Sequence, residues 1–132
     1  MRKILVVDDE TSVLGIIREI LEHENMEVFT ATNPNDALEI FKSERPQIVL
    51  SDLDLGSGMD GLTLCGKIRT EIPKTITIAM SGYLSAYDLS YCLGSGMFND
   101  AISKPWNNVI LIRVLNEWFV KRERWNLVNG LI

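Results

Sequence analysis

Cysteine and histidine are scarce in this sequence, which holds two cysteines and one histidine among 132 residues. Cys65 and Cys92 form no CxxC pair and fall in apolar helical patterns, so we expect buried free thiols in a reducing cytosol. His23 lies near the polar end of the first expected helix and is predicted to be a solvated surface residue. This scarcity argues against a disulfide framework and against a zinc site.

Basic residues and long apolar runs are also lacking. Thirteen Lys and Arg residues against 18 Asp and Glu residues give a net charge of -5, which argues against direct nucleic-acid binding. The amino terminus is basic and then apolar, but its apolar run stops at Asp8 and is too short for a signal peptide. No stretch reaches the length of a membrane span, so we expect a cytoplasmic protein without membrane contact.

Short apolar runs that alternate with amphipathic stretches indicate the fold. Most of the runs lack period-two alternation, as expected for strands covered on both faces. Five β-then-α units predict one α/β domain, a doubly wound five-stranded parallel sheet with right-handed crossovers. The expected strands are residues 4–7, 27–31, 48–50, 76–80 and 101–103, and the fifth helix is expected over residues 109–119.

Polar residues collect where these strands end. In a parallel sheet, ligands bind outside the carboxyl ends of the strands, so residues that follow different strands meet at one edge. Crowded carboxylates repel one another unless a cation joins them, and an all-oxygen cluster suits Mg²⁺ better than zinc. The residues at the strand ends are Asp8, Asp9, Glu10, Ser51, Asp52, Asp54, Ser81, Ser103 and Lys104.

This combination predicts phosphoryl transfer to a carboxylate. The carboxylate would attack phosphorus in line, a metal and Lys104 would offset charge on the transferring oxygens, and the Ser81 hydroxyl would hold one of them. Each residue alone has an ordinary structural explanation: Asp8 and Asp9 as a helix cap, Ser81 as a turn residue and Lys104 as a surface lysine. Four strand ends carrying the whole set in one fold favour the functional interpretation.

The motifs at these strand ends resemble the response-regulator receiver family over about residues 3–119. They are Val6-Val7-Asp8-Asp9-Glu10, Ile48-Val49-Leu50-Ser51-Asp52, Met59-Asp60-Gly61, Met80-Ser81-Gly82 and Ser103-Lys104-Pro105. The resemblance implies a flavodoxin-like (βα)5 fold and Asp52 as the residue that accepts a phosphoryl group. Asp54 is the rival acceptor, but Asp52 closes the apolar strand and Asp54 falls in the loop that follows.

The same resemblance implies the roles of the neighbouring residues. Asp9 and Asp52 would bind Mg²⁺ directly with the backbone carbonyl of Asp54, and Asp8 would act mainly through a bound water. Ser81 would donate a hydrogen bond to the phosphoryl group, and Lys104 would form an ion pair with it. The Lys104–Pro105 peptide bond would be cis, a minority state even before proline.

The sequence departs from the family pattern at three places. The loop over residues 53–60 is one residue longer than usual and has Gly56 in place of a proline, although no phosphate-binding glycine motif is present. Ser81 replaces the commoner threonine. Ala101 stands where the family usually has Tyr or Phe, so the usual aromatic switch is absent or displaced to Phe98, Tyr83 or Trp106.

We therefore predict a Mg²⁺-dependent signalling switch, phosphorylated on Asp52 by a histidine kinase or a histidine phosphotransfer protein. It would catalyse only its own phosphorylation and dephosphorylation, with Asp54 and Tyr83 as candidates for setting the phosphate lifetime. Phosphorylation would change the surface of the fourth helix, fifth strand and fifth helix. The alternatives are an interaction module that works without phosphorylation, and a phosphatase for small substrates, which would need an enclosing segment that so short a chain lacks.

The tail defines a second region. We expect a receiver domain over residues 1–120 and a helical extension or linker over residues 121–132, with the final residues suggesting a piece of a longer protein. An apolar stripe at helical spacing either folds back on the domain or leads to an output domain or a homodimer contact. The stripe consists of Leu111, Leu115, Trp118, Trp125, Val128 and Leu131.

Overall fold

The computed structural model describes residues 1–55, 60–82 and 86–130, without the side chains of residues 86–89, and confirms the predicted α/β architecture. Five parallel strands form one sheet in the order β2-β1-β3-β4-β5. The strands are β1 (Arg2–Val7), β2 (Met26–Ala31), β3 (Ile48–Asp52), β4 (Ile76–Ser81) and β5 (Asp100–Ser103). The helices are α1 (Thr11–Glu22), α2 (Pro34–Glu44), α3 (Gly61–Glu71), α4 (Ala86–Gly94) and α5 (Asn108–Val128).

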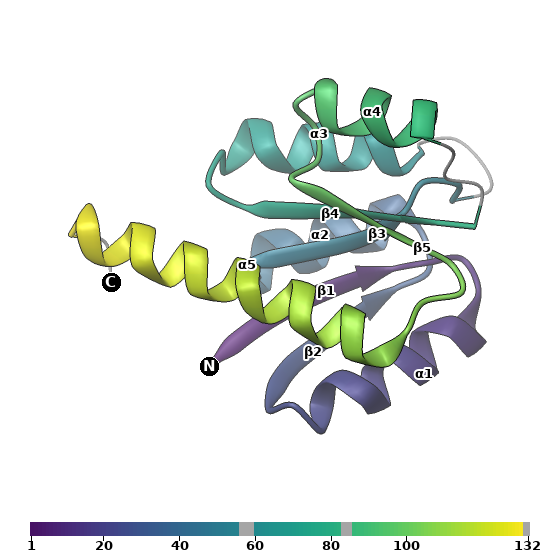
Figure 1. Ribbon diagram of the computed structural model, residues 1–132, viewed down its shortest axis with the longest axis horizontal. Helices are drawn as coiled ribbons and strands as arrows, with labels where there is room; N and C mark the ends of the chain where they lie inside the picture. The colour runs from purple at the N-terminus through teal and green to yellow at the C-terminus, as the bar shows by residue number, and fades with distance from the viewer. Residues whose placement is uncertain (56–59, 83–85, 131–132) are drawn as a thin grey trace.

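Two apolar layers hold the helices against the sheet, with α1 and α5 on one face and α2, α3 and α4 on the other (Figure 1). On the first face, Ile17 of α1 and Phe119 of α5 pack with alternate residues of the strands. On the second face, Phe41 of α2 and Ile68 of α3 pack with the other set of alternate strand residues. Both faces of the central strands are buried, which explains why their sequences show continuous apolar runs instead of alternation.

Helix starts are fixed by local side-chain caps. The Asn33 side chain accepts a hydrogen bond from the Asp36 backbone N–H at 2.9 Å, and Pro34 follows as the first helical residue. Asp60 caps α3 in the same way by accepting from Thr63 at 2.8 Å. The Asn107 side chain accepts hydrogen bonds from the backbone N–H groups of Val109 and Ile110, the second and third residues of α5, and so caps the start of that helix.

Because all five strands are parallel, the sheet has one end at which every strand finishes and an opposite end at which every strand starts. The chain leaves β1 toward β2 on one side and later enters β3 on the other side, so the carboxyl ends of β1 and β3 flank the point where the strand order reverses. This is the position where open α/β sheets bind ligands. We call the end where the strands finish the carboxyl edge and the end where they start the amino edge. Helix α5 runs from the carboxyl edge to beyond the amino edge (Figure 1).

Several smaller predictions are also confirmed. Cys65 and Cys92 are both buried, and His23 is exposed. The Lys104–Pro105 peptide bond is cis. No helix among the described residues is long and apolar enough to cross a membrane.

Candidate functional site

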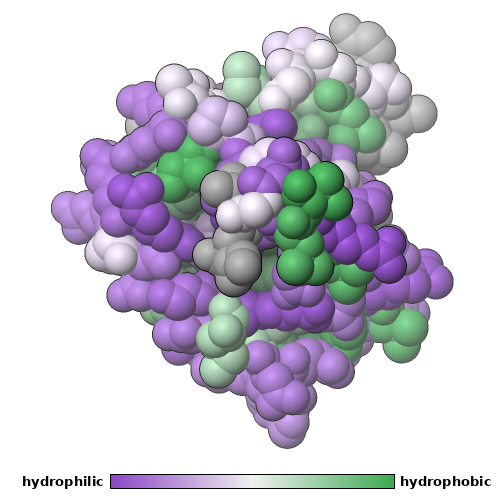
Figure 2. Space-filling model, turned by 90° about the vertical axis from the view of Figure 1, so that its left-hand side faces the viewer, coloured by the Kyte–Doolittle hydropathy of each residue, from purple (hydrophilic) through white to green (hydrophobic). Residues whose placement is uncertain are grey.

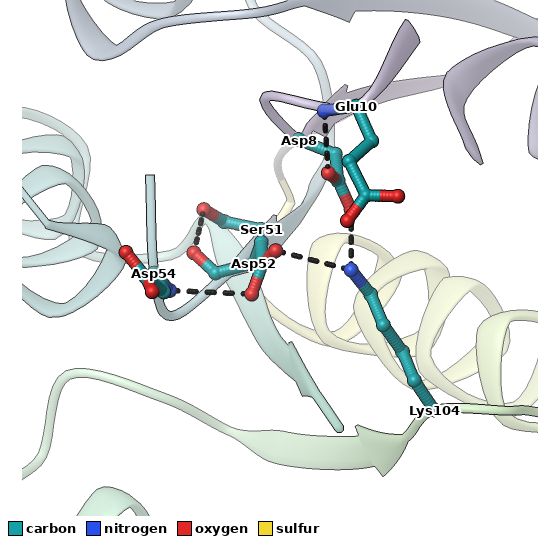
Figure 3. Close-up of polar contacts among 6 residues, drawn as sticks. All are labelled: Asp8, Glu10, Ser51, Asp52, Asp54 and Lys104. Carbon is teal, nitrogen blue, oxygen red and sulfur yellow. Dashed lines mark hydrogen bonds and ion pairs between the residues drawn. The ribbon is translucent and has the colours of Figure 1, made fainter. Parts of the chain in front are cut away.

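Asp52 occupies the end of β3 at the carboxyl edge. Its side chain is buried, with 8% of the residue exposed, and β1 and β4 flank it through the pairs Val7–Ser51 and Asp52–Met80. One carboxylate oxygen, Oδ1, accepts the backbone N–H of Asp54 at 3.2 Å (Figure 3). The strand therefore presents a single oriented carboxylate at the switch point of the sheet, while the side chain of Asp54 is exposed.

Lys104 reaches from the end of β5 to two carboxylates at once. Its Nζ donates to Asp8 Oδ2 at 2.7 Å and to Asp52 Oδ2 at 3.0 Å, and Figure 3 shows the ammonium group between the two acids. Asp8 is fully buried, and its other oxygen accepts the backbone N–H of Glu10 at 2.9 Å. Three strands thus contribute one side chain each to a bridged cluster with two acids and one base.

Burial and pairing act in opposite directions on this cluster. Burial raises the pKa of Asp52, and the hydrogen bonds from Lys104 and from the Asp54 backbone offset this only in part. Burial alone would lower the pKa of Lys104, but its hydrogen bonds to Asp8 and Asp52 outweigh that effect and raise the pKa. Lys104 therefore stays protonated, and the cluster retains an excess of negative charge that a further cation would relieve.

A cluster of three carboxylates next to this bridge fits a hard divalent cation. Oxygens of Asp8, Asp9 and Glu10 lie within 4.8 Å of one another, with Asp8 buried and the other two exposed. Ligands that are all oxygen and partly open to solvent match the preference of Mg²⁺. Glu10 was placed at this strand end by the sequence but was assigned no role; the hydrogen bond from its N–H to Asp8 brings it back over the site.

Ser81 ends β4 beside the cluster. It pairs in register with Ser103, and its carbonyl oxygen accepts the backbone N–H of Lys104 at 2.9 Å. The predicted hydroxyl residue and the predicted lysine are therefore held next to each other by the sheet itself. Of the metal ligands that the resemblance implies, the structure brings Asp8 and Asp52 together through Lys104 and places Asp9 beside Asp8.

Gly61 closes the loop that follows Asp52. Its N–H donates to the Leu53 carbonyl at 3.0 Å, and a Cβ built on it would overlap the Asp52 backbone carbonyl oxygen. Glycine is therefore required at this position for α3 to begin against the end of β3. Gly56, which stands in place of the family's usual proline, lies outside the described residues.

The residues near the family's switch position are divided between the two apolar layers. Ala101 packs against the second layer, in which Phe98 is buried with 3% exposure. Trp106 is partly buried against the first layer, and its Nε1 donates to Asn108 Oδ1 at 3.1 Å. Tyr83, the third candidate for an aromatic switch, lies outside the described residues.

Comparison with known proteins identifies the family. Residues 4–116 match the model of the response regulator receiver domain, and the chain belongs to this family of two-component signalling domains. A 14.6 kDa protein in the sodA1 3' region of Leptolyngbya boryana, itself uncharacterized, is 37% identical over 118 residues, which is 87% of this chain and 88% of that protein. The nitrogen assimilation regulatory protein NtrX of Azorhizobium caulinodans is 34% identical over 125 residues, 91% of this chain.

Solved structures show the same fold. A CheY-like receiver domain protein from Methanospirillum hungatei superposes with a TM-score of 0.86 and 29% identity, covering 94% of this chain and 98% of that one. NtrX from Brucella abortus superposes with a TM-score of 0.90 and 29% identity over 100% of this chain. The chain spans only 27% of the Azorhizobium NtrX and 30% of the Brucella NtrX chain, so the likeness to NtrX concerns its receiver part.

Proposed function

We propose that this receiver is a Mg²⁺-dependent switch that takes a phosphoryl group on Asp52 from a phosphohistidine in a two-component phosphorelay. The observation that carries the proposal is the buried Asp52 carboxylate at the switch point of the sheet, hydrogen-bonded to Lys104 at 3.0 Å. The phosphohistidine would belong to a histidine kinase or a histidine phosphotransfer protein, and the exchange would take place in the cytoplasm.

The chemistry follows from the charges on the chain. An Asp52 oxygen attacks phosphorus, the phosphorus–nitrogen bond of the donor breaks, and the imidazole leaves with the electron pair of that bond and takes up a proton. Lys104 exchanges Asp52 for a phosphoryl oxygen while keeping its bond to Asp8, and the Ser81 hydroxyl donates to another phosphoryl oxygen. In the dephosphorylation reaction, water attacks phosphorus, the bond between phosphorus and the Asp52 oxygen breaks, and the Asp52 carboxylate is restored with release of inorganic phosphate.

Mg²⁺ would be held directly by Asp9, Asp52 and the backbone carbonyl of Asp54, and by Asp8 mainly through a bound water, with Glu10 close by. When bound, it supplies positive charge that offsets the negative charge of the carboxylates and the incoming phosphoryl group. The excess of acid over base around Lys104 supports this assignment. No turnover of other substrates is part of the proposal: the chain would catalyse only its own phosphorylation and dephosphorylation.

The test is the intact mass of the protein after incubation with Mg²⁺ and acetyl phosphate. We expect a gain of one phosphoryl group in the parent and none in Asp52→Asn, whereas Asp54→Asn should be labelled like the parent. Labelling of Asp52→Asn, or loss of labelling in Asp54→Asn alone, would assign the acceptor to another residue. Hydrolysis of an added phosphomonoester by the parent would instead indicate a phosphatase.

Ala101 favours a second candidate function, an interaction module that binds partners without phosphorylation. Its methyl group replaces the aromatic ring that usually reports the phosphorylation state, and Phe98 nearby is already buried. If acetyl phosphate adds no mass and beryllofluoride with Mg²⁺ leaves the amide spectrum unchanged, this second function is the better explanation. Either function would use exposed apolar residues of α5, such as Val109 and Leu127, for an output domain or a second copy.

A further inference from the structure

A groove of about 650 Å³ lies at the amino edge, on the opposite side of the sheet from Asp52. It runs between the last turns of α5 and the segment that joins α3 to β4. Figure 2 shows this end of the molecule, where hydrophilic residues cover most of the surface and hydrophobic residues show only in separate places. The lining residues that matter here are Ile72, Lys74, Thr75, Trp118, Arg122 and Trp125.

The walls of the groove are apolar and aromatic. Trp118 is fixed in place because its Nε1 donates to Asp100 Oδ2 at 2.9 Å and because the Lys121 ammonium lies 4.3 Å from its ring centroid. Trp125, two turns further along α5, is 46% exposed, and Ile72 contributes to the lining from the segment that joins α3 to β4. Aromatic walls of this kind favour a flat ring, which gains both apolar burial and stacking contact.

Positive charge at the groove is only partly compensated. The Arg122 Nη1 donates to the Gln47 carbonyl at 3.0 Å, but its buried Nε has no hydrogen-bond partner. Burial lowers the pKa of Arg122, and among the described residues no carboxylate forms an ion pair with it or with Lys74. A guanidinium that has lost water without gaining an acid favours an anion as its partner.

A buried hydroxyl group in the same wall also lacks a partner. Thr75 is 1% exposed, and its Oγ1 forms no hydrogen bond. A buried polar atom left in this state costs free energy. The groove therefore combines aromatic walls with a guanidinium that has no acidic partner, in a space that is large enough for a small molecule.

We propose that this groove binds a small planar aromatic anion, with its ring between Trp118 and Trp125 and its carboxylate toward Arg122 and Lys74. The site is separate from the phosphorylation chemistry and does not depend on Asp52. Because the lining holds three cationic side chains, Lys74, Lys121 and Arg122, and one acid, Glu71, a neutral ring of the same shape would bind less tightly.

The experiment uses 2-naphthoate as the probe and follows the indole N–H signals of the three tryptophans by NMR. We expect saturable shifts of the Trp118 and Trp125 signals and no shift of Trp106, which lies at the carboxyl edge. The neutral analogue 2-naphthylmethanol should bind about tenfold more weakly, the difference made by one charge-assisted contact. Unchanged Trp118 and Trp125 signals, or equal affinity for the two probes, would overturn the proposal.

Matched variants separate the groove from general attraction to positive charge. Arg122→Met should weaken naphthoate binding about tenfold, whereas Arg124→Met, which removes an exposed arginine outside this groove, should leave it unchanged. Lys74→Met changes an exposed side chain and so tests the charge even if Arg122→Met does not fold; equal affinity in that variant and the parent would contradict the proposal. Asp52→Asn should bind naphthoate like the parent, which distinguishes this site from the proposed switch.

Discussion

The two edges of the sheet carry ion pairs of opposite kinds. At the carboxyl edge, Lys104 is shared by two buried acids, with 19% of its side chain exposed and none of Asp8. At the amino edge, Arg2 pairs with Glu123 at 3.0 Å and Lys3 with Glu44 at 3.4 Å, and at least a third of each side chain is exposed. The ion pairs of the carboxyl edge are therefore buried and leave one acid in excess, whereas those of the amino edge are exposed and match one acid to one base.

The two kinds of ion pair differ in what they contribute to the free energy of folding. Exposed pairs contribute little to stability because water already solvates both partners. A buried cluster with an excess of one sign is costly, and it persists where its charge serves binding or chemistry. The net charge of the chain does not show this division, since it averages the two edges.

The largest expected effect comes from the turn that supports the carboxyl edge. Gly61→Ala should lower the free energy of unfolding by about 4 kcal/mol, because the new methyl group meets the Asp52 carbonyl and backbone must move. Urea unfolding measures the change. Gly15→Ala in α1, where nothing lies within 4 Å of the new methyl group, is the control and should be neutral or stabilising. A loss below 1 kcal/mol in Gly61→Ala, on the order of an average substitution, would contradict this reasoning.

Removing the shared base should come next. Lys104→Met leaves the fully buried Asp8 without its ion-pair partner, so we expect a loss of about 3 kcal/mol at neutral pH. The control is Lys67→Met, which removes an exposed lysine of α3 that forms no ion pair among the described residues. Mg²⁺ should stabilise Lys104→Met more than the parent, because the lysine no longer competes for the carboxylates. Equal stabilisation of the two proteins would argue against a metal at this cluster.

The pH dependence of the Lys104 effect has a defined sign. The pKa of Lys104 is raised in the folded protein, so its stabilising contribution is complete below the unfolded pKa of about 10.4 and is lost as pH rises through the folded value. The difference in stability between the parent and Lys104→Met should therefore stay constant from neutral pH to about pH 10 and narrow above it. Thermal unfolding of both proteins across this range provides the measurement.

A smaller effect of opposite sign is expected at Asp52. Its raised pKa means that the fold disfavours the carboxylate form, so Asp52→Asn should stabilise the protein by about 1 kcal/mol at pH 7. The gain should disappear below about pH 4, where Asp52 is protonated in both folded and unfolded protein. Denaturant titrations at the two pH values give the comparison. Destabilisation at pH 7 would mean that the bond from Lys104 outweighs burial.

The smallest effect belongs to the amino edge. Glu123→Gln breaks the exposed pair with Arg2 and should change the free energy of unfolding by no more than about 0.5 kcal/mol. Added salt should reduce even this difference, since exposed charges are screened. If Glu123→Gln cost as much as Lys104→Met, the contrast between the two edges would be wrong.

The fold was predictable because the central residues of each strand are apolar, but the first and last residues of the strands were not predictable. The expected strands 4–7 and 48–50 extend in the structure to Arg2–Val7 and Ile48–Asp52. Backbone pairing sets these ends: Arg2 pairs with Met26 and Asp52 with Met80, although their polar side chains interrupt the apolar pattern. The fifth helix likewise runs to Val128 instead of residue 119, so the division of the chain at residue 120, still a prediction, falls inside a continuous helix.

The apolar stripe of the tail divides along this helix. Leu111 and Leu115 are buried and Trp118 packs against the same layer, whereas Val128 is 85% exposed and Leu131 lies outside the described residues. Spacing alone predicted a helix but not which turns of it meet the domain. That depends on where the sheet stops, which no local pattern records.

The candidate site was predictable for a topological reason. Parallel strands carry their carboxyl ends to one edge, so Asp8, Asp52, Ser81 and Lys104 could be grouped before any distance was known. The ion-pair partners of Lys104 could not be predicted. A long, flexible lysine side chain can reach several acids, and which of them it pairs with depends on distances that only the packed structure defines. The groove at the amino edge was missed for the same reason, since its walls come from α5 and from a connection about fifty residues earlier.

The single helix α5 gives the molecule a mechanical property. It has 21 residues, so it is a rod of about 30 Å that starts just after Lys104 and Pro105 and ends past the amino edge. A rod of this length is a lever: a tilt of roughly 5° about its first turn would carry its far end through roughly 3 Å. A rearrangement at the carboxyl edge that tilts α5 in this way would therefore move Trp125, about 25 Å along the helix, by roughly 2 Å.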